Sequence, residues 1–163
     1  MEIEIREFCY KDIKATISIW NEVVKTGIAF PQIDILDENT GLKFFKEQSF
    51  TGVALNNNQI VGVYILHPNN IGRCGHICNA SYAVAQNMRG MHIGEQLVKH
   101  CIQKAKEKNY KILQFNAVVS TNLRALKLYK KLGFVQLGTI PNGFLMKDGT
   151  YQDIIPHYIE LKP

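Results

Sequence analysis

A chain of 163 residues, with 46% hydrophobic and 20% charged residues, has the composition of a globular protein and room for one domain with a sizeable core. Its apolar runs are all shorter than the roughly 20 residues that cross a membrane, so no membrane partner is expected. The net charge of +5 suits an anionic ligand, but without a recognisable motif it does not predict nucleic-acid binding.

The cysteines and the first residues indicate a compartment. Four cysteines lie in a chain too long for a disulfide scaffold, and the opening MEIEIREFCYKDI resembles neither a signal peptide nor a transit peptide. We therefore expect reduced thiols and a cytoplasmic protein. No segment has the composition of a linker, so residues 1–163 are predicted to form one domain.

Hydrophobic periodicity and turn residues predict the elements along the chain. Alternation of apolar and polar residues favours strands, whereas apolar residues three or four apart favour helices. Asparagines at 56–58 predict a hairpin turn, and Pro156 requires an edge strand or a bulge. In chain order we expect a strand over 2–7, helices over 12–25 and 38–48, strands over 50–55, 59–66 and 76–84, a helix over 94–109, a strand over 111–119, a helix capped by Thr121 or Asn122 and stopping at Gly133, and strands over 134–140 and 151–161. The order predicts a single-domain mixed α/β fold with a mostly antiparallel sheet flanked by helices.

Residues 86–97, QNMRGMHIGEQL, place Gly90 and Gly94 at the start of a predicted helix. Glycine there lets the backbone approach a ligand closely, and a helix N-terminus offers free N–H groups to an anion. Glu95 and Gln96 stand where a nucleotide-hydrolase phosphate loop needs lysine followed by serine or threonine, and a dinucleotide fingerprint needs a third glycine. Both are excluded, which leaves a backbone cradle for a pyrophosphate that requires no metal.

A second motif, NLRALKLYKKLGF at residues 122–134, follows the next predicted strand. The order strand, R-G-x-x-x-G, helix, strand and N-x-x-A-x-x-L-Y-x-x-x-G-F resembles the GNAT superfamily of acetyl-CoA-dependent N-acetyltransferases. The resemblance is strongest over residues 77–134, and the order of elements extends it over nearly the whole chain. The superfamily's usual loop is R/Q-x-x-G-x-G/A, and His92 replaces the first of its two glycines. The N–H of His92 remains available to a ligand if its φ stays negative.

The resemblance implies acetyl-CoA as the cofactor. Its pyrophosphate would lie on the loop N–H groups and its pantetheine arm along the strand end, and a backbone N–H near Val84 would face the thioester oxygen. Asn122 matches the family asparagine that hydrogen-bonds the arm, and Tyr129 matches the tyrosine that protonates the departing thiolate as a general acid. Homodimerisation is a further expectation from the family. The residues expected to bind the cofactor are Tyr82, Ala83, Val84, Arg89, Gly90, Met91, His92, Ile93, Gly94 and Asn122.

A looser similarity, over residues 17–27 and the C-terminal stretch, is to the phosphinothricin and methionine-sulfone acetyltransferases of the superfamily. It implies a small amine as substrate, such as an amino acid or an analogue, which attacks the thioester directly. Alternation along the strand places Asn79 and Ser81 on one face, where they would line a polar funnel with Gln114 and Asn116.

Two phenylalanines are ambiguous at this stage. Phe30 and Phe144 would form apolar walls of a substrate site or belong to the core.

The sequence does not identify the base that deprotonates the amine. His76, Glu22 and His157 are titratable candidates, with a structural role as the alternative for each and a water chain as the alternative to all. Cys74, His76 and Cys78 alternate like metal ligands but lack an evident fourth ligand, and buried cysteine is common, so no metal site is predicted.

Two rival functions stay open. One is acetylation of protein lysines or N-termini, which an acidic groove would favour and the positive charge of this chain does not support. The other is a non-catalytic acyl-CoA-binding module, which would have no need of an acid at Tyr129.

Overall fold

The predicted hairpin forms and organises the first half of the sheet. In the computed structural model, which describes residues 2–162, β2 (Phe50–Asn56) and β3 (Gln59–Pro68) are joined by Asn57 and Asn58, both at positive φ. Asparagine tolerates that conformation, which a tight two-residue hairpin turn requires. β1 (Glu4–Glu7) pairs with β2, and β4 (Ile77–Val84) pairs with β3, all antiparallel.

The second half of the sheet joins the first through one short parallel contact. β5 (Ile112–Val119) pairs with β4 at Ile77–Ile112 and Cys78–Leu113. β8 (Tyr151–Glu160) lies antiparallel to β5, with β6 (Val135–Gln136) and β7 (Ile140–Leu145) along its other side. The strand order is β1-β2-β3-β4-β5-β8-β6 with β7 also on β8, so the expected mixed and mostly antiparallel sheet is confirmed.

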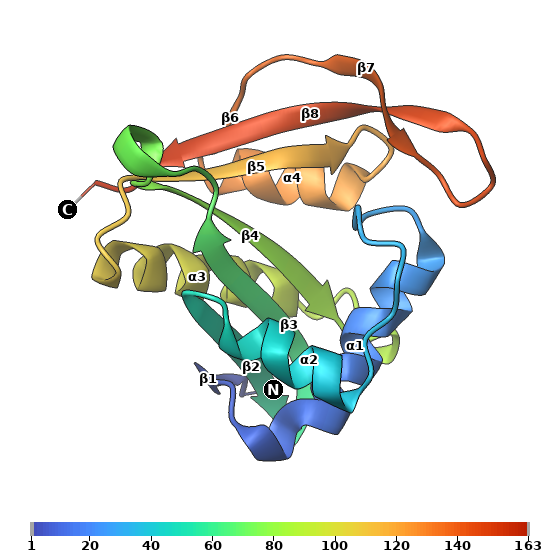
Figure 1. Cartoon of the computed structure of the whole chain (residues 1–163), viewed down its shortest axis with the longest axis vertical. Helices are drawn as coiled ribbons and strands as arrows, with labels where there is room; N and C mark the ends of the chain where they lie inside the picture. The colour runs from blue at the N-terminus through green and yellow to red at the C-terminus, as the bar shows by residue number, and fades with distance from the viewer. Residues whose placement is uncertain (1, 163) are drawn as a thin grey trace.

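Helices cover both faces of the sheet (Figure 1). One core cluster lies on the face of α1 and α2 and includes Trp20 and Phe45. A second lies on the face of α3 and α4 and includes Leu97 and Leu113, and a small third cluster includes Phe144. No helix within residues 2–162 is long and apolar enough to cross a membrane. The helical elements are α1 (Ile13–Thr26), α2 (Glu38–Lys46), α3 (Ile93–Glu107) and α4 (Leu123–Lys131), with short 3-10 turns η1 (Tyr10–Asp12), η2 (Gly72–Cys74) and η3 (Gln86–Met88).

The C-terminal strands differ from the prediction. The strand expected over 134–140 is reduced to β6, and the chain then passes Gly138, at φ 133°, into β7, which the sequence does not predict. Pro156 lies inside the sheet, opposite a bulge between Phe115 and Val118 of β5. Of the two alternatives for Pro156 the bulge is confirmed and the edge strand is wrong, because β6 and β7 cover the far side of β8.

An ion pair ties the edge strand β1 to the start of α1. The Arg6 guanidinium donates to both carboxylate oxygens of Asp12, at 2.7 and 2.8 Å, and the Cys9 N–H donates to the same carboxylate. Burial of Asp12 works to raise the pKa of its carboxyl, but the hydrogen bonds from Arg6 and Cys9 outweigh it and lower the pKa to about 2. The pair is therefore ionised throughout the neutral range.

Candidate cofactor and acyl-transfer site

β4 and β5 diverge beyond their paired positions, and the opening lies where β4 ends (Figure 1). On its other edge β4 stays paired with β3 up to Val84, and the Ala85 N–H donates to the Val61 carbonyl at 2.9 Å. Backbone groups of an antiparallel strand alternate between its two edges, so Ala83 bonds to β3 whereas Tyr82 and Val84 turn their N–H and C=O groups toward the opening. Among the strand residues expected to hold the cofactor, Tyr82 and Val84 thus offer free backbone groups and Ala83 offers its side chain.

A cleft of about 650 Å³ lies at this opening. Its walls come from the end of β4, the loop before α3, the start of α4 and the end of α1. The lining residues are Val23, Thr26, Ile28, Ala29, Tyr82, Ala83, Val84, Arg89, Thr121, Asn122, Leu123, Arg124 and Met146. Residues expected to bind the cofactor on three separate segments therefore meet in one cleft.

The loop before α3 presents free backbone N–H groups. His92 has a φ of 59°, so the condition that its φ stays negative is not met, yet no protein group within residues 2–162 accepts a hydrogen bond from the N–H groups of residues 90–95. These groups lie at the positive end of a 15-residue helix. Unpaired N–H groups at the positive end of a helix are the groups that an anion such as a pyrophosphate needs.

Two lysines balance the negative charge of an acidic side chain beside this loop. Glu95, in the first turn of α3, bonds to Lys131 of α4 at 2.7 Å and to Lys99 at 2.9 Å. The hydrogen bonds from Lys131 and Lys99 lower the pKa of Glu95 to about 2. The carboxylate thus stays ionised and links α3 to α4 through Lys131. The two lysines balance its negative charge beside the loop.

Asn122 has two chemically separate ends. Its side-chain oxygen accepts the Ala125 N–H at 3.2 Å and caps α4, which leaves its NH₂ group free for a ligand in the cleft. Of the two expected caps, Asn122 is the one that forms.

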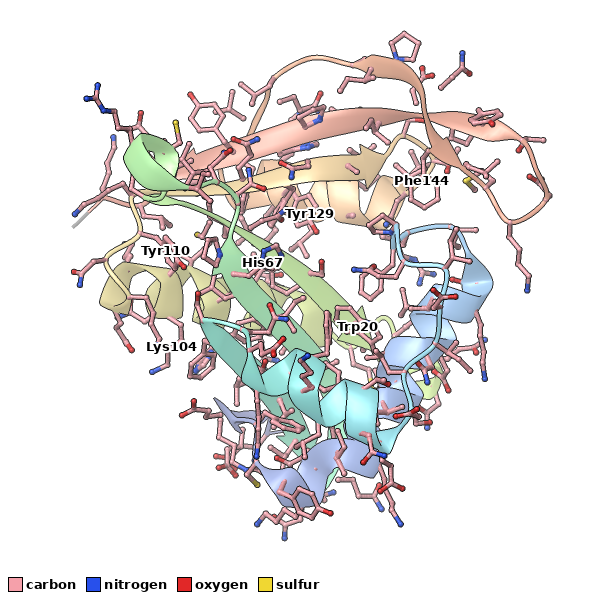
Figure 2. All side chains as sticks on the ribbon, viewed as in Figure 1. Trp20, His67, Lys104, Tyr110, Tyr129 and Phe144 are labelled. Carbon is pink, nitrogen blue, oxygen red and sulfur yellow. The ribbon has the colours of Figure 1, made fainter. Side chains whose placement is uncertain are left out.

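Tyr129 lies two turns further along α4, below β5 (Figure 2). It does not line the cleft itself; its ring packs against Phe115, Phe134 and His157, with centroids 4.5, 5.3 and 5.7 Å away. Burial, with a smaller effect from Cys101, raises the pKa of the Tyr129 hydroxyl above its usual value. Tyr129 therefore keeps its proton at neutral pH, as an acid must.

Two of the candidate bases lie away from the cleft. His76 is exposed and precedes the first residue of β4, at the opposite end of the strand from Val84. Glu22 is exposed on the outer side of α1, between the buried Asn21 and Val23. Neither expectation survives as a direct role in the cleft, because an eight-residue strand separates His76 from it and α1 turns Glu22 outward.

His157, the third candidate, is buried at 1% exposure and its Nδ1 bonds to the Ile155 carbonyl at 2.7 Å. Burial lowers its pKa, which keeps the ring neutral. Cys74 belongs to η2, so it does not share a strand face with Cys78. No group of three His, Cys, Asp or Glu side chains in the described part of the chain is placed to hold a metal ion.

Three of the four side chains expected to line a polar funnel are hydrogen-bonded in a cluster around Asn69, which is not among the predicted site residues, and none of the four lines the cleft. Asn79 and Asn116 both donate to the Asn69 side-chain oxygen, at 3.3 and 2.7 Å, and Gln114 donates to Asn116. Ser81 lies on the same face of β4 as Asn79. The two asparagines directly after β3, Asn69 and Asn70, are the sequence signal that could have pointed to it.

A second hollow, named here the apolar cavity, has a volume of about 610 Å³. Phe30 and Phe144 both line it and are both nearly buried, at 7% and 6% exposure, so both belong to the core and both also face this cavity. Figure 2 shows Phe144 pointing from β7 toward the chain that follows α1. The lining residues are Val24, Lys25, Gly27, Phe30, Pro31, Gln32, Ile33, Gly143, Phe144, Leu145, Met146 and Lys147.

Comparison with known proteins agrees with this geometry. The model of the Acetyltransferase (GNAT) family matches residues 17–134, well over half of the chain, and the chain therefore belongs to the GNAT family. The N-acetyltransferase aca1 of Schizosaccharomyces pombe is 32% identical over 88 residues, which cover 54% of this chain and 42% of that protein. The chain spans less than half the length of the curated relatives it matches.

Solved structures share the whole fold. A GCN5-related N-acetyltransferase from Kribbella flavida is 28% identical with a TM-score of 0.89, over 97% of each chain. A candidate acetyltransferase from Salmonella typhimurium, yncA, solved with its cofactor acetyl-CoA, is 18% identical with a TM-score of 0.91, over 100% of this chain and 96% of that one. A candidate phosphinothricin N-acetyltransferase has a TM-score of 0.87 at 18% identity, over 99% and 100%. The GNAT family uses acetyl-CoA, and the cofactor expected from the sequence is confirmed at that level.

Proposed function

We propose that this protein moves the acetyl group of acetyl-CoA to the primary amine of a small molecule, such as an amino acid or an analogue. The observation that carries the proposal is the meeting, in one cleft, of the free strand end Tyr82–Val84, the loop before α3 and the cap of α4. Each offers the kind of group that a different part of the cofactor needs. Bound acetyl-CoA supplies the activated thioester.

The residues divide the work of binding. N–H groups from Gly90 to Gly94 receive the pyrophosphate, with the side chains of Arg89 and Arg124 lining the cleft beside them. Free backbone groups of Tyr82 and Val84 bond to the amide-bearing arm in the manner of an added strand. The NH₂ group of Asn122 donates to the same arm.

The residues near the thioester stabilise charge and supply a proton. The Val84 N–H faces the opening and donates to the carbonyl oxygen as negative charge develops on it. Tyr129, which burial keeps protonated, holds the proton that the thiolate receives, and its ring packs against Phe115. We propose water as the route by which the amine loses its proton, because His76 and Glu22 point elsewhere.

The acceptor amine is proposed to enter from the side of α1. Phe30 supplies an apolar contact, while Asn79, Ser81 and Asn116 line the polar face of the sheet between β4 and β5. No acidic residue lines the cleft or the apolar cavity, which favours a small acceptor over a basic peptide or a polyamine.

We further propose a cytoplasmic homodimer that joins through the outer surface of β6, β7 and β8. Large apolar side chains on these strands and the loop between them are at least 50% exposed: Val135, Leu137, Ile140, Leu145 and Tyr151. Sedimentation should give twice the chain mass of 18.5 kDa, and the double substitution V135D/L137D should halve it. A wild-type monomer at tens of micromolar would contradict the dimer.

The test of the function pairs calorimetry of acetyl-CoA binding with thiol release across amino acids, polyamines, aminoglycosides and a lysine peptide. Binding with turnover on small amines supports the proposal. Turnover on the lysine peptide alone would favour the protein acetyltransferase, and binding without any turnover would favour the non-catalytic module. Absence of acetyl-CoA binding would contradict all three.

A further inference from the structure

The apolar cavity is a second hollow beside the cofactor cleft, and it is open to solvent on the side of Ile33. Phe30, Ile33, Phe144 and Leu145 supply most of its apolar wall, and its volume of about 610 Å³ lies within the roughly 300–1,000 Å³ typical of small-molecule sites. Phe30 is held rigidly, because its ring packs against Trp20 with centroids 4.5 Å apart. A preformed apolar wall of this kind favours an apolar group in the ligand.

One polar group in this wall has no partner. The side-chain oxygen of Gln32 is buried and accepts no hydrogen bond within residues 2–162. A buried amide oxygen without a donor costs free energy that a ligand N–H or O–H would restore. Gln32 therefore favours a ligand whose apolar part carries one hydrogen-bond donor.

The charges around the cavity select the rest of the ligand. Lys25 and Lys147 contribute to its lining, and no Asp or Glu does. Two ammonium groups repel a polycation and attract a carboxylate. Aminoglycosides and polyamines are thus disfavoured, whereas an amino acid carries the matching negative group.

The cavity and the cofactor cleft are adjacent. Met146 lines both, and the turn after α1 separates them, with Gly27 facing the cavity and Ile28 facing the cleft. A molecule whose side chain fills the cavity can present its amine to the cleft past Met146.

We propose that the apolar cavity binds the side chain of the acceptor, and that the acceptor is an amino acid with a bulky apolar side chain bearing one hydrogen-bond donor, which Gln32 recognises. The inference rests on the proposed acetyl transfer. In that reaction the amine nitrogen bonds to the acetyl carbon, the carbon–sulfur bond breaks, and the proton lost by the amine balances the one gained by the thiolate.

Tryptophan is the matching probe, since its indole is apolar and carries a single N–H. Calorimetry on wild-type protein saturated with coenzyme A measures binding without turnover. We expect tryptophan to bind at least about tenfold more tightly than alanine, and 1-methyltryptophan, which lacks the N–H, to bind about tenfold more weakly than tryptophan. Tryptamine, without the carboxylate, should bind several-fold more weakly, and spermidine should not bind.

A substitution at Gln32 distinguishes two effects of the methyl group in 1-methyltryptophan, namely the loss of the indole N–H and the added steric bulk. Gln32→Met keeps the length of the side chain and removes the unpartnered oxygen, so tryptophan and 1-methyltryptophan should bind with affinities within about twofold of each other. Gln103→Met is the matched control on the exposed surface of α3, and it should retain the tenfold preference. Circular dichroism checks that both variants fold.

The outcomes distinguish this inference from the function on which it rests. Equal binding of tryptophan and alanine would overturn the cavity as the side-chain site, and equal binding of tryptophan and 1-methyltryptophan to the wild type would overturn the role of Gln32. Either result leaves acetyl transfer standing if other amines release thiol. Selective binding of tryptophan without thiol release from any amine would instead remove the transferase while retaining the cavity as a ligand site.

Discussion

The two ends of β4 differ in their hydrogen bonding, since the start is paired on both edges and the end on one. At its start, Ile77 and Cys78 pair with β5, and the Cys78 thiol, wholly buried, lies 3.2 Å from the Ile112 carbonyl. At its end, Tyr82 and Val84 have a partner on one side only. One strand thus joins the two halves of the sheet where its hydrogen bonds are complete and forms part of the candidate site where they are left open. We infer from this difference that the candidate site forms because the pairing of β4 with β5 stops after two residues, and that few specialised side chains contribute to it.

The largest effect is expected from a change at the start of α3, where we propose that the pyrophosphate of acetyl-CoA binds. Gly94 is the second residue of α3, where proline is tolerated, and an added Cβ there would find Val84 Cγ2 no closer than 4.0 Å. Gly94→Pro should therefore fold but lose an N–H and weaken acetyl-CoA binding by about a hundredfold or more, measured by calorimetry. Glu38→Pro, at the first position of α2, is the control and should leave the affinity unchanged. Wild-type affinity in folded Gly94→Pro would place the cradle elsewhere.

The next largest effect is expected from removal of the Tyr129 hydroxyl, the proposed general acid. Tyr129→Phe keeps the packing against Phe115 and Phe134 and removes the hydroxyl. We expect kcat to fall by about a hundredfold with little change in the dissociation constant of acetyl-CoA. Tyr110→Phe, which removes a hydroxyl bonded to Ser49, should keep full activity. Full turnover by Tyr129→Phe would show that another group protonates the thiolate.

A change at the ion pair between β1 and the start of α1, away from the open end of β4, should affect stability alone. The pKa of Asp12 is lowered to about 2 in the folded protein, so its ion pair contributes stability above the unfolded pKa and loses it as the pH falls from about 4 to about 2. Asp12→Asn should lower the free energy of unfolding at pH 7 by about 2 kcal/mol and flatten its acid dependence, measured by urea denaturation. Acetyl-CoA affinity should not change. A variant with the wild-type acid profile would contradict the role given to this pair.

The smallest expected effect separates the two ends of one side chain. Asn122→Ser keeps a cap on α4 but removes the NH₂ group, so stability should hold while acetyl-CoA binding weakens about threefold to tenfold. Asn122→Ala should lose the same affinity and in addition about 1 kcal/mol of stability. Calorimetry and thermal unfolding measure the two quantities. Equal affinity in Asn122→Ser and wild type would restrict Asn122 to its capping role.

Most of the fold could be predicted because its elements bury one regular face. The alternation of residues 76–84 and the helical spacing in α1 are such patterns, and both elements form within a residue or two of the expected bounds. β7 could not be predicted, since Phe144 is its only buried residue and leaves no period to detect.

The candidate site was predictable where local order determines it and not where distant segments meet. Gly90, Gly94 and Asn122 stand at the starts of two predicted helices, and the sequence shows such starts directly. By contrast, the burial of the Gln32 side-chain oxygen depends on how the segment after α1 packs against β7. Sequence periodicity contains no information on that contact.

The packing of Trp20 against Phe30 has an optical consequence. The chain contains one tryptophan, buried to 1% exposure, so all of its indole emission arises from a single place behind the wall of the apolar cavity. An acceptor that packs on Phe30 changes the surroundings of that indole, and a transparent ligand such as leucine or methionine adds no emission of its own. The protein thereby carries a built-in fluorescent reporter of cavity occupancy that needs no label and no turnover.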